Sequence, residues 1–236
     1  MSNLEQKASI IIPFFNEQST LEKSVTSLIS ENFEKEILLI NDGSTDKSKE
    51  IAQQLSTTFD NVELINNEKN NGKGFAVRKG LERASGDVIG IYDADLEYSA
   101  SDLTELINCI FNEDLDFVCG SRFIGDKVRK NIYLRTFYAN KLLSLLFAFI
   151  YKNKITDIAV CLKVFKKDII KNITFEKNDF SIEVELIAKV ISKTKKFKEL
   201  PISYEGRSYK EGKKIKFIDG FKYIIAIFKY KWSQIN

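Results

Sequence analysis

The 236-residue sequence contains no histidine, only two prolines and only three cysteines. The absence of histidine excludes Ser–His and Cys–His catalytic dyads and histidine-ligated metals, so acid–base and metal chemistry must use other side chains or the substrate. The three cysteines (Cys109, Cys119 and Cys161) are odd in number and widely spaced, which predicts reduced thiols and a cytoplasmic location. The 36 basic and 33 acidic residues give a net charge of +3, too small to indicate a nucleic-acid-binding protein.

Long apolar runs are also missing. The longest uncharged apolar stretch near the middle of the chain, 142–151, has ten residues, whereas a transmembrane helix needs about 20. Residues 1–7 are polar and have no signal-peptide core. The sequence therefore predicts a protein that is soluble or attached to a membrane surface.

Apolar and amphipathic segments alternate through the first half of the chain. Short apolar runs predict buried parallel strands at 9–13, 36–40, 62–65, 88–92 and 115–119. Apolar spacing predicts the intervening helices, which start near Leu21 and after Asp46 or lie at 74–84 and 99–112. This alternation predicts an α/β fold with a doubly wound, mostly parallel, Rossmann-like sheet, in which ligands bind at the carboxyl ends of the strands.

The second half contains two basic clusters, within 121–135 and within 207–216, each with a single acidic residue. The surrounding pattern predicts helices at about 132–151 and 180–192 and strands near 161–166 and 197–204. The last stretch, 217–232, mixes aromatic, aliphatic and lysine residues, which is typical of a helix lying at an anionic membrane interface. For 142–151, a buried core helix is an equally good interpretation.

Acidic residues follow three of the predicted strands. Glu17 follows the first strand, Asp42 the second, and Asp93, Asp95 and Glu97 the fourth. Because Asp93 and Asp95 are two residues apart, an extended backbone places both carboxylates on the same side. Paired carboxylates suit Mg²⁺ or Mn²⁺, with water and a substrate phosphate completing the coordination. A solvated turn at the end of the strand is the alternative interpretation.

Two further loops admit both a structural and a functional interpretation. The segment 41–46 fits an ordinary turn, or a carboxylate that accepts hydrogen bonds from a ribose or a nucleobase. The glycine-containing segment 70–74 fits a plain turn, or a helix start whose backbone N–H groups bind phosphate. It has neither the P-loop spacing nor the Rossmann spacing.

Taken together and in order, these motifs resemble the family-two glycosyltransferases, which have the GT-A fold. The motifs are P-x-x-N-E at 13–17, N-D-G-S-T-D at 41–46, N-x-G-K-G-x-A-x-x-x-G at 70–80, G-D-x-x-x-x-x-D-A-D at 86–95 and G-S-R at 120–122. Later segments resemble the polyprenyl-phosphate branch of the family, which is dolichyl-phosphate mannosyltransferase-like. These segments include 156–157, 161–165, 180–185 and 211–215.

The resemblance implies one glycosyltransferase domain over 1–236. It would comprise a nucleotide-sugar-binding half (about 8–120), an acceptor-binding half (about 121–216) and a basic, membrane-proximal amphipathic helix (217–236). The implied reaction moves mannose or glucose, with inversion, from a GDP- or UDP-sugar to dolichyl or undecaprenyl phosphate at the cytoplasmic face of a membrane. A saccharide hydroxyl acceptor, in surface-polysaccharide or glycolipid synthesis, is the alternative, and a non-catalytic nucleotide-sugar-binding module is a further one. The sequence leaves the oligomeric state open.

The resemblance also implies roles for individual residues. The expected donor contacts are Pro13, Glu17, Asp42, Lys73, Asp93 and Asp95. The expected ligands of the Mg²⁺ or Mn²⁺ ion are Asp93, Asp95 and Glu97. The expected phosphate and acceptor contacts are Arg122, Arg135, Arg207 and Lys213. The residues expected to take part in catalysis are Asp95, Arg122 and Asp157, the last for sugar positioning or proton handling. A lipid phosphate is already anionic at neutral pH and needs little general-base help, which agrees with the absence of histidine.

Overall fold

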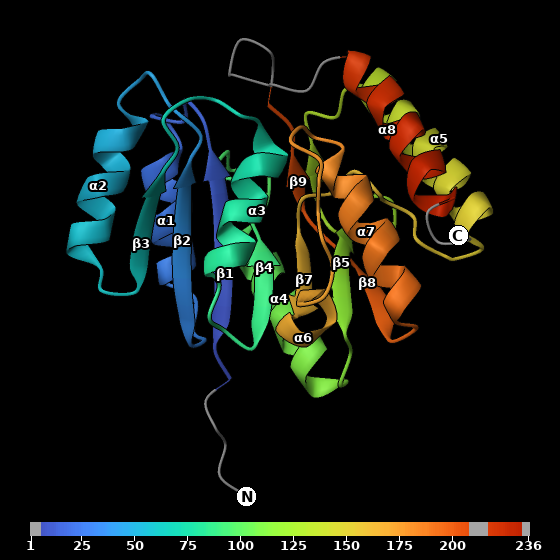
Figure 1. Ribbon diagram of the computed structural model, residues 1–236, viewed down its shortest axis with the longest axis horizontal. Helices are drawn as coiled ribbons and strands as arrows, with labels where there is room; N and C mark the ends of the chain where they lie inside the picture. Colours follow the sequence, from blue (N-terminus) through green and yellow to red (C-terminus); the bar gives the residue numbers. More distant parts are fainter. Residues whose placement is uncertain (1–5, 208–216, 233–236) are drawn as a thin grey trace, which may run out of the picture.

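A single mixed sheet forms the centre of the molecule (Figure 1). The computed structural model describes residues 6–207 and 217–232. Within these residues the sheet has seven strands in the order β3-β2-β1-β4-β7-β5-β8. Their bounds are β1 (Ala8–Phe14), β2 (Lys35–Asn41), β3 (Val62–Asn66), β4 (Val88–Ile91), β5 (Phe117–Ser121), β7 (Lys163–Lys166) and β8 (Phe197–Pro201). Neighbouring strands are parallel except at β7, which runs antiparallel to both β4 and β5. The predicted α/β fold with a mostly parallel sheet is confirmed.

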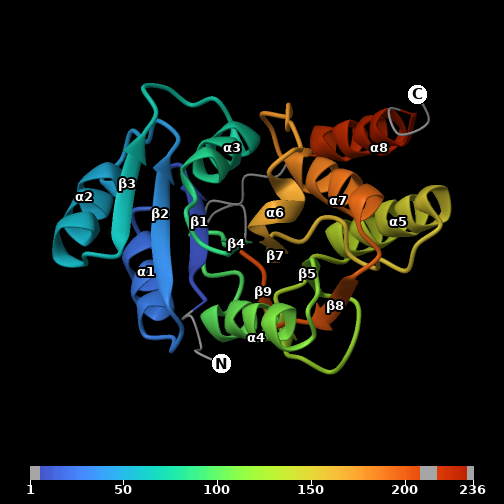
Figure 2. The same ribbon diagram turned by 60° about the horizontal axis from the view of Figure 1, so that its bottom comes forward.

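Helices cover both faces of this sheet (Figures 1 and 2). Their bounds are α1 (Leu21–Ile29), α2 (Ser48–Thr58), α3 (Lys73–Arg83), α4 (Ala100–Asn112), α5 (Leu134–Tyr151), α6 (Lys167–Ile170), α7 (Ile182–Lys193) and α8 (Phe217–Trp232). On one face α1 contacts α2 and α4, and on the other face α3 contacts α7. All seven residues of β1 are buried, because this central strand is covered from both sides. Burial on both faces explains why the sequence of this strand is a continuous apolar run and does not alternate between apolar and polar residues.

Helix α8 packs against the rest of the molecule. It contacts α5 and α7, and its buried apolar residues are Tyr223, Ala226, Ile227 and Tyr230. The Tyr151 hydroxyl at the end of α5 donates a 2.9 Å hydrogen bond to the Ile227 carbonyl oxygen. No helix in the described part of the chain combines the length and the apolar character needed to cross a bilayer. The predicted C-terminal appendage is therefore a helix with one face in the core.

Three features beyond β5 differ from the sequence prediction. The expected strand at 197–204 is divided into β8 and a short β9 (Tyr204–Glu205). Strand β9 pairs in parallel with β6 (Arg129–Lys130), and the sequence pattern predicted neither this pair nor α6. Because β8 ends at Pro201, the chain leaves the main sheet there, and Arg207 then comes back to the carboxyl ends of β1 and β4.

Candidate functional site

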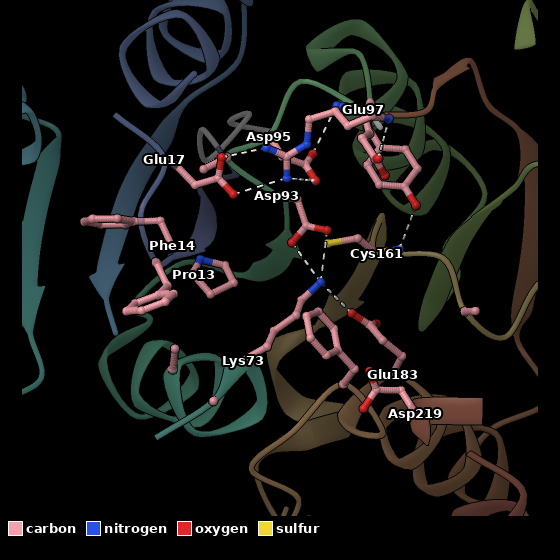
Figure 3. A pocket seen from close by; sticks show the side chains of 18 of the residues that line it. Pro13, Phe14, Glu17, Lys73, Asp93, Asp95, Glu97, Cys161, Glu183 and Asp219 are labelled. Carbon is pink, nitrogen blue, oxygen red and sulfur yellow. Dashed lines mark hydrogen bonds and ion pairs between the residues drawn. The ribbon is translucent and has the colours of Figure 1, made fainter. Parts of the chain in front are cut away.

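A cavity of about 520 Å³ opens at the carboxyl ends of β1, β2 and β4 (Figure 3). The loops after these strands and the start of α3 form one side of it, and α5, β9, α7 and α8 contribute residues to the other. The expected site residues that line it are Pro13, Glu17, Asp42, Lys73, Asp93, Asp95, Glu97, Arg122 and Arg207. The structure thus brings together most of the side chains that the sequence singled out from both halves of the chain.

Two expected site residues are not among the described residues that line the cavity, and a third is not described by the structure. Arg135 is exposed on α5 and is not among the described residues that border the cavity. Asp157 is completely buried, behind Arg122. Lys213 lies outside the described residues.

Lys73 is held between two carboxylates. Its Nζ lies 2.8 Å from Asp93 Oδ1 and 2.8 Å from Glu183 Oε1 (Figure 3). Burial opposes the charge on this ammonium, but Asp93 and Glu183 outweigh burial and raise the pKa of Lys73. Burial likewise acts to raise the pKa of Asp93, and the ammonium of Lys73 overcomes it and holds that pKa below its usual value. Asp93 is therefore an ionised carboxylate facing the cavity.

Arg207 joins two of the acidic loops. Its Nη1 lies 2.8 Å from Glu17 Oε2, and its Nη2 lies 2.9 Å from Asp95 Oδ2. Burial and the nearby carboxylates of Asp93 and Glu97 raise the pKa of Asp95 to about 7, although the guanidinium acts in the opposite direction. An additional positive charge would therefore stabilise the ionised form of Asp95, which burial and its acidic neighbours disfavour.

Both carboxylate oxygens of Glu97 accept hydrogen bonds from residues of the second half of the chain. One of its carboxylate oxygens accepts a 2.9 Å hydrogen bond from the Tyr204 hydroxyl, and the other accepts a 2.8 Å bond from the backbone N–H of Arg207. In the described part of the chain, no three Asp, Glu, Cys or His side chains are grouped closely enough to hold a metal ion. These two hydrogen bonds fix the chain around Arg207 and β9, and the expected part of Glu97 in metal binding stays a prediction.

Arg122 and Asp157 form a buried, two-pronged ion pair. Arg122 Nε lies 2.7 Å from Asp157 Oδ2, and Nη2 lies 2.9 Å from Oδ1. The Arg122 guanidinium carbon is also 5.1 Å from the centre of the Tyr204 ring. Asp157 is not among the described residues that line the cavity, and its expected part in sugar positioning or proton handling stays a prediction. In the structure its carboxylate orients the Arg122 guanidinium, which borders the cavity.

Backbone N–H groups at the start of α3 and in the loop before it already donate hydrogen bonds to other parts of the protein. Asp42 accepts hydrogen bonds from the N–H groups of Asn71 (3.0 Å) and Gly72 (2.7 Å), and the Asn178 carbonyl accepts from Gly74 N–H (2.7 Å). Gly72 has a positive φ of 99°, and a Cβ there would lie 2.4 Å from the Asn178 carbonyl oxygen. The interpretation of 70–74 as a set of free N–H groups for phosphate is therefore wrong for these three donors.

The charge of the cavity bears on which cofactor it accepts. Among the described residues, its lining carries seven acidic and three basic side chains. Asp93 and Asp95 present hard oxygen ligands, and Mg²⁺ or Mn²⁺ is typically held by one or two carboxylates together with substrate phosphates. The excess of negative charge would repel an anionic ligand that arrived alone. The donor set therefore fits a divalent cation that binds together with a phosphate-containing ligand.

Sequence reasoning missed Glu183 as a site residue. It is 2% exposed and lies on α7, surrounded in sequence by the buried residues Ile182, Val184 and Leu186. A carboxylate in such an apolar stretch requires a buried cationic partner, which is the signal that could have identified it.

The family model described as "Glycosyl transferase family 2" matches residues 9–174. The chain belongs to this family. Among the relatives of this glycosyltransferase, the dolichol-phosphate mannosyltransferase of Pyrococcus furiosus is 31% identical over 96% of the present chain. The present chain spans only 64% of the length of that relative. The UDP-N-acetylglucosamine–dolichyl-phosphate N-acetylglucosaminyltransferase of Methanococcus voltae is 26% identical, with 96% of both chains covered.

A solved structure supports the fold of this glycosyltransferase independently. The glucosyl-3-phosphoglycerate synthase of Mycobacterium tuberculosis, solved with Mn²⁺, UDP and glucosyl-3-phosphoglycerate, matches with a TM-score of 0.75. The match covers 96% of this chain and 80% of the synthase, at 14% identity. At this identity the likeness concerns the fold alone, and the expected GT-A fold is confirmed.

Proposed function

We propose that this glycosyltransferase moves a hexose, with inversion, from a nucleoside-diphosphate sugar to a polyprenyl phosphate. The observation that carries the proposal is the cavity that the Asp93–Asp95 pair shares with the buried Arg122 and the half-buried Arg207. Relatives that cover most of this chain are named for transfer of mannose or N-acetylglucosamine to dolichyl phosphate, which favours a lipid phosphate as the acceptor.

The donor would bind on the side of the parallel strands. Asp93 and Asp95 would hold a Mg²⁺ or Mn²⁺ ion, which supplies Lewis-acid stabilisation of the departing nucleoside diphosphate. The M. tuberculosis structure, which contains Mn²⁺ and UDP, supports this choice of ion and nucleotide class. Pro13 and Asp42, in the loops after β1 and β2, would border the nucleoside, and Lys73 would lie beside the diphosphate.

The acceptor would bind on the side of Arg122. A lipid phosphate is mostly dianionic at pH 7 because its second pKa is about 6, so it can act as a nucleophile without a protein base. Arg122, oriented by Asp157, would bind its oxygens through the fixed fork of the guanidinium. The lipid phosphate and the diphosphate of the donor would thus be brought together by Arg122 on the acceptor side and by the divalent ion and Lys73 on the donor side.

The apolar chain of such an acceptor would remain in a membrane beside α5 and α8. Both helices border the cavity, α5 through Thr136 and Leu143 and α8 through Tyr223. Both also expose apolar side chains, and these are Leu134, Tyr138, Leu142, Leu145 and Phe149 on α5 and Ile218, Phe221, Ile224, Ile225, Phe228 and Trp232 on α8. We call this set the apolar face. A peripheral contact of the apolar face with a membrane would bring a lipid phosphate to the mouth of the cavity.

Transfer should be tested with the full chain, Mn²⁺ and a short polyprenyl phosphate, against GDP- and UDP-activated mannose, glucose and N-acetylglucosamine. We expect one donor to give a lipid-linked sugar together with free nucleoside diphosphate. The Asp95→Asn variant is the inactive control, and a variant of an exposed ion pair, Glu63→Gln, is the active one. Sugar transfer to free saccharides but not to the lipid phosphate would contradict the acceptor assignment. Nucleotide-sugar binding without product would instead indicate a binding module.

A further inference from the structure

Four side chains of alternating charge, two of them half-buried and two buried, connect the cavity to the interior. Lys163 of β7 is completely buried and forms an ion pair with Glu183 of α7. The other oxygen of Glu183 lies 2.8 Å from Lys73, which in turn is 2.8 Å from Asp93. Figure 3 shows Lys73 directed between Asp93 and Glu183. We call this set, Lys163–Glu183–Lys73–Asp93, the buried charge chain. Asp93, Lys73 and Glu183 border the cavity, and Lys163 lies behind them.

Within the buried charge chain, Lys73 and a divalent cation would compete for the same carboxylate. An ion that binds Asp93 removes one of the two partners of Lys73, and a buried ammonium without a partner is strongly unfavourable. Glu183 removes that penalty because it still accepts from Lys73 after Asp93 has turned to the ion. Lys163 acts in the opposite sense, because it attracts the same carboxylate and so weakens the hold of Glu183 on Lys73.

We propose that Glu183 and Lys163 are positioning residues that set how strongly Lys73 competes with the divalent cation for Asp93. The proposal rests on the metal site of the proposed function, and it adds to that site two residues that need not contact the substrate. The geometry behind it is the single carboxylate of Glu183 shared between two ammonium groups, one bordering the cavity and one completely buried.

Two nearly isosteric variants are expected to change metal affinity in opposite directions. Glu183→Gln leaves Lys73 with Asp93 as its one anionic partner in the buried charge chain and adds a positive charge near the site, so Mn²⁺ should bind roughly tenfold more weakly. In Lys163→Met, Glu183 no longer pairs with Lys163 and interacts with Lys73 more strongly. The substitution also removes a positive charge, so Mn²⁺ should bind roughly threefold more tightly. Both variants disturb a buried ion pair and should lower stability. A purely structural role would therefore weaken Mn²⁺ binding in both.

The measurement is a titration of the full chain with Mn²⁺ alone, in which free Mn²⁺ is followed by electron paramagnetic resonance, with thermal unfolding of each variant alongside. A matched control is available on the same helix, where Glu185 is also completely buried and pairs with Lys189. Glu185→Gln should lower stability and leave the Mn²⁺ affinity unchanged, because Glu185 does not border the cavity.

The double variant Lys163→Met/Glu183→Gln keeps the net charge and leaves no unpaired ion behind Lys73. It is expected to fold even if a single variant does not, and to bind Mn²⁺ roughly threefold more weakly than the wild type because Lys73 has lost its second carboxylate. Wild-type affinity in the double variant, or a shift of both single variants in the same direction, would overturn the proposal. Absence of Mn²⁺ binding by the wild type would instead overturn the metal site itself, and this proposal with it.

Discussion

Replacing Asp157 with asparagine tests how strongly its carboxylate stabilises Arg122, which borders the cavity. The carboxylate is completely buried and makes 2.7 and 2.9 Å contacts with Arg122, whose side chain is 11% exposed. Removing one partner of a buried pair usually costs about 3–5 kcal/mol, because the remaining charge is left without compensation. Arg122 borders the cavity and can recruit some water there, so we expect the lower end, about 3 kcal/mol. For a protein of this size that lowers the unfolding midpoint by roughly 6–12 °C.

The assay is thermal and urea unfolding of the wild type, Asp157→Asn, Arg122→Gln and the double variant. The double variant should be more stable than the sum of the single losses predicts, because it leaves no buried ion unpaired. Arg83→Gln is the matched control, since its pair with Glu63 is exposed and such pairs contribute less than about 1 kcal/mol. A loss for Asp157→Asn no larger than the loss for Arg83→Gln would refute the reasoning.

Three further predictions concern the metal, the pH and the membrane. Asp95→Asn should abolish sugar transfer and Mn²⁺ binding while the protein stays folded, as circular dichroism can check; activity at the wild-type level would contradict the ligand role. Because the pKa of Asp95 is raised to about 7, protons should compete with Mn²⁺ below that value. Titrations from pH 5.5 to 8 should therefore show affinity that rises with pH and levels off above about 7, and a pH-independent affinity would disprove this competition. Phe149, 83% exposed on the apolar face, should anchor the protein to anionic vesicles. Phe149→Asp should sediment less with them than the control Gln54→Asp on α2, and equal sedimentation would argue against the membrane contact.

The sequence contained enough information to predict the sheet and the acidic edge of the site. The apolar run at β1 and the spacing of Asp93 and Asp95 are local signals, because each depends on residues adjacent in the chain. The antiparallel direction of β7 has no such signal. Strand β7 has four residues with a lysine at each end, so its residue pattern is the same whichever way the strand runs. The direction of the strand is determined by its pairing with β4 and β5 in the folded protein.

The pairing of the site side chains could not be predicted from the sequence. Lys73 is 20 residues from Asp93, and Arg207 is 112 residues from Asp95. Which cation faces which carboxylate depends on how the folded chain returns to the sheet edge, and no local pattern encodes that return. The same reason explains Asp157, since a sequence motif does not tell whether a carboxylate faces a cavity or lies behind the arginine that does.

The position of β7 restricts how this enzyme can open and close. It is hydrogen-bonded to β4 on one side and to β5 on the other, so the strands of the first half and the strands of the second half belong to one continuous sheet. A hinge between two rigid lobes would have to break those hydrogen bonds. Motion during turnover is therefore expected in the chain segments that lie outside the sheet, while the strands remain still.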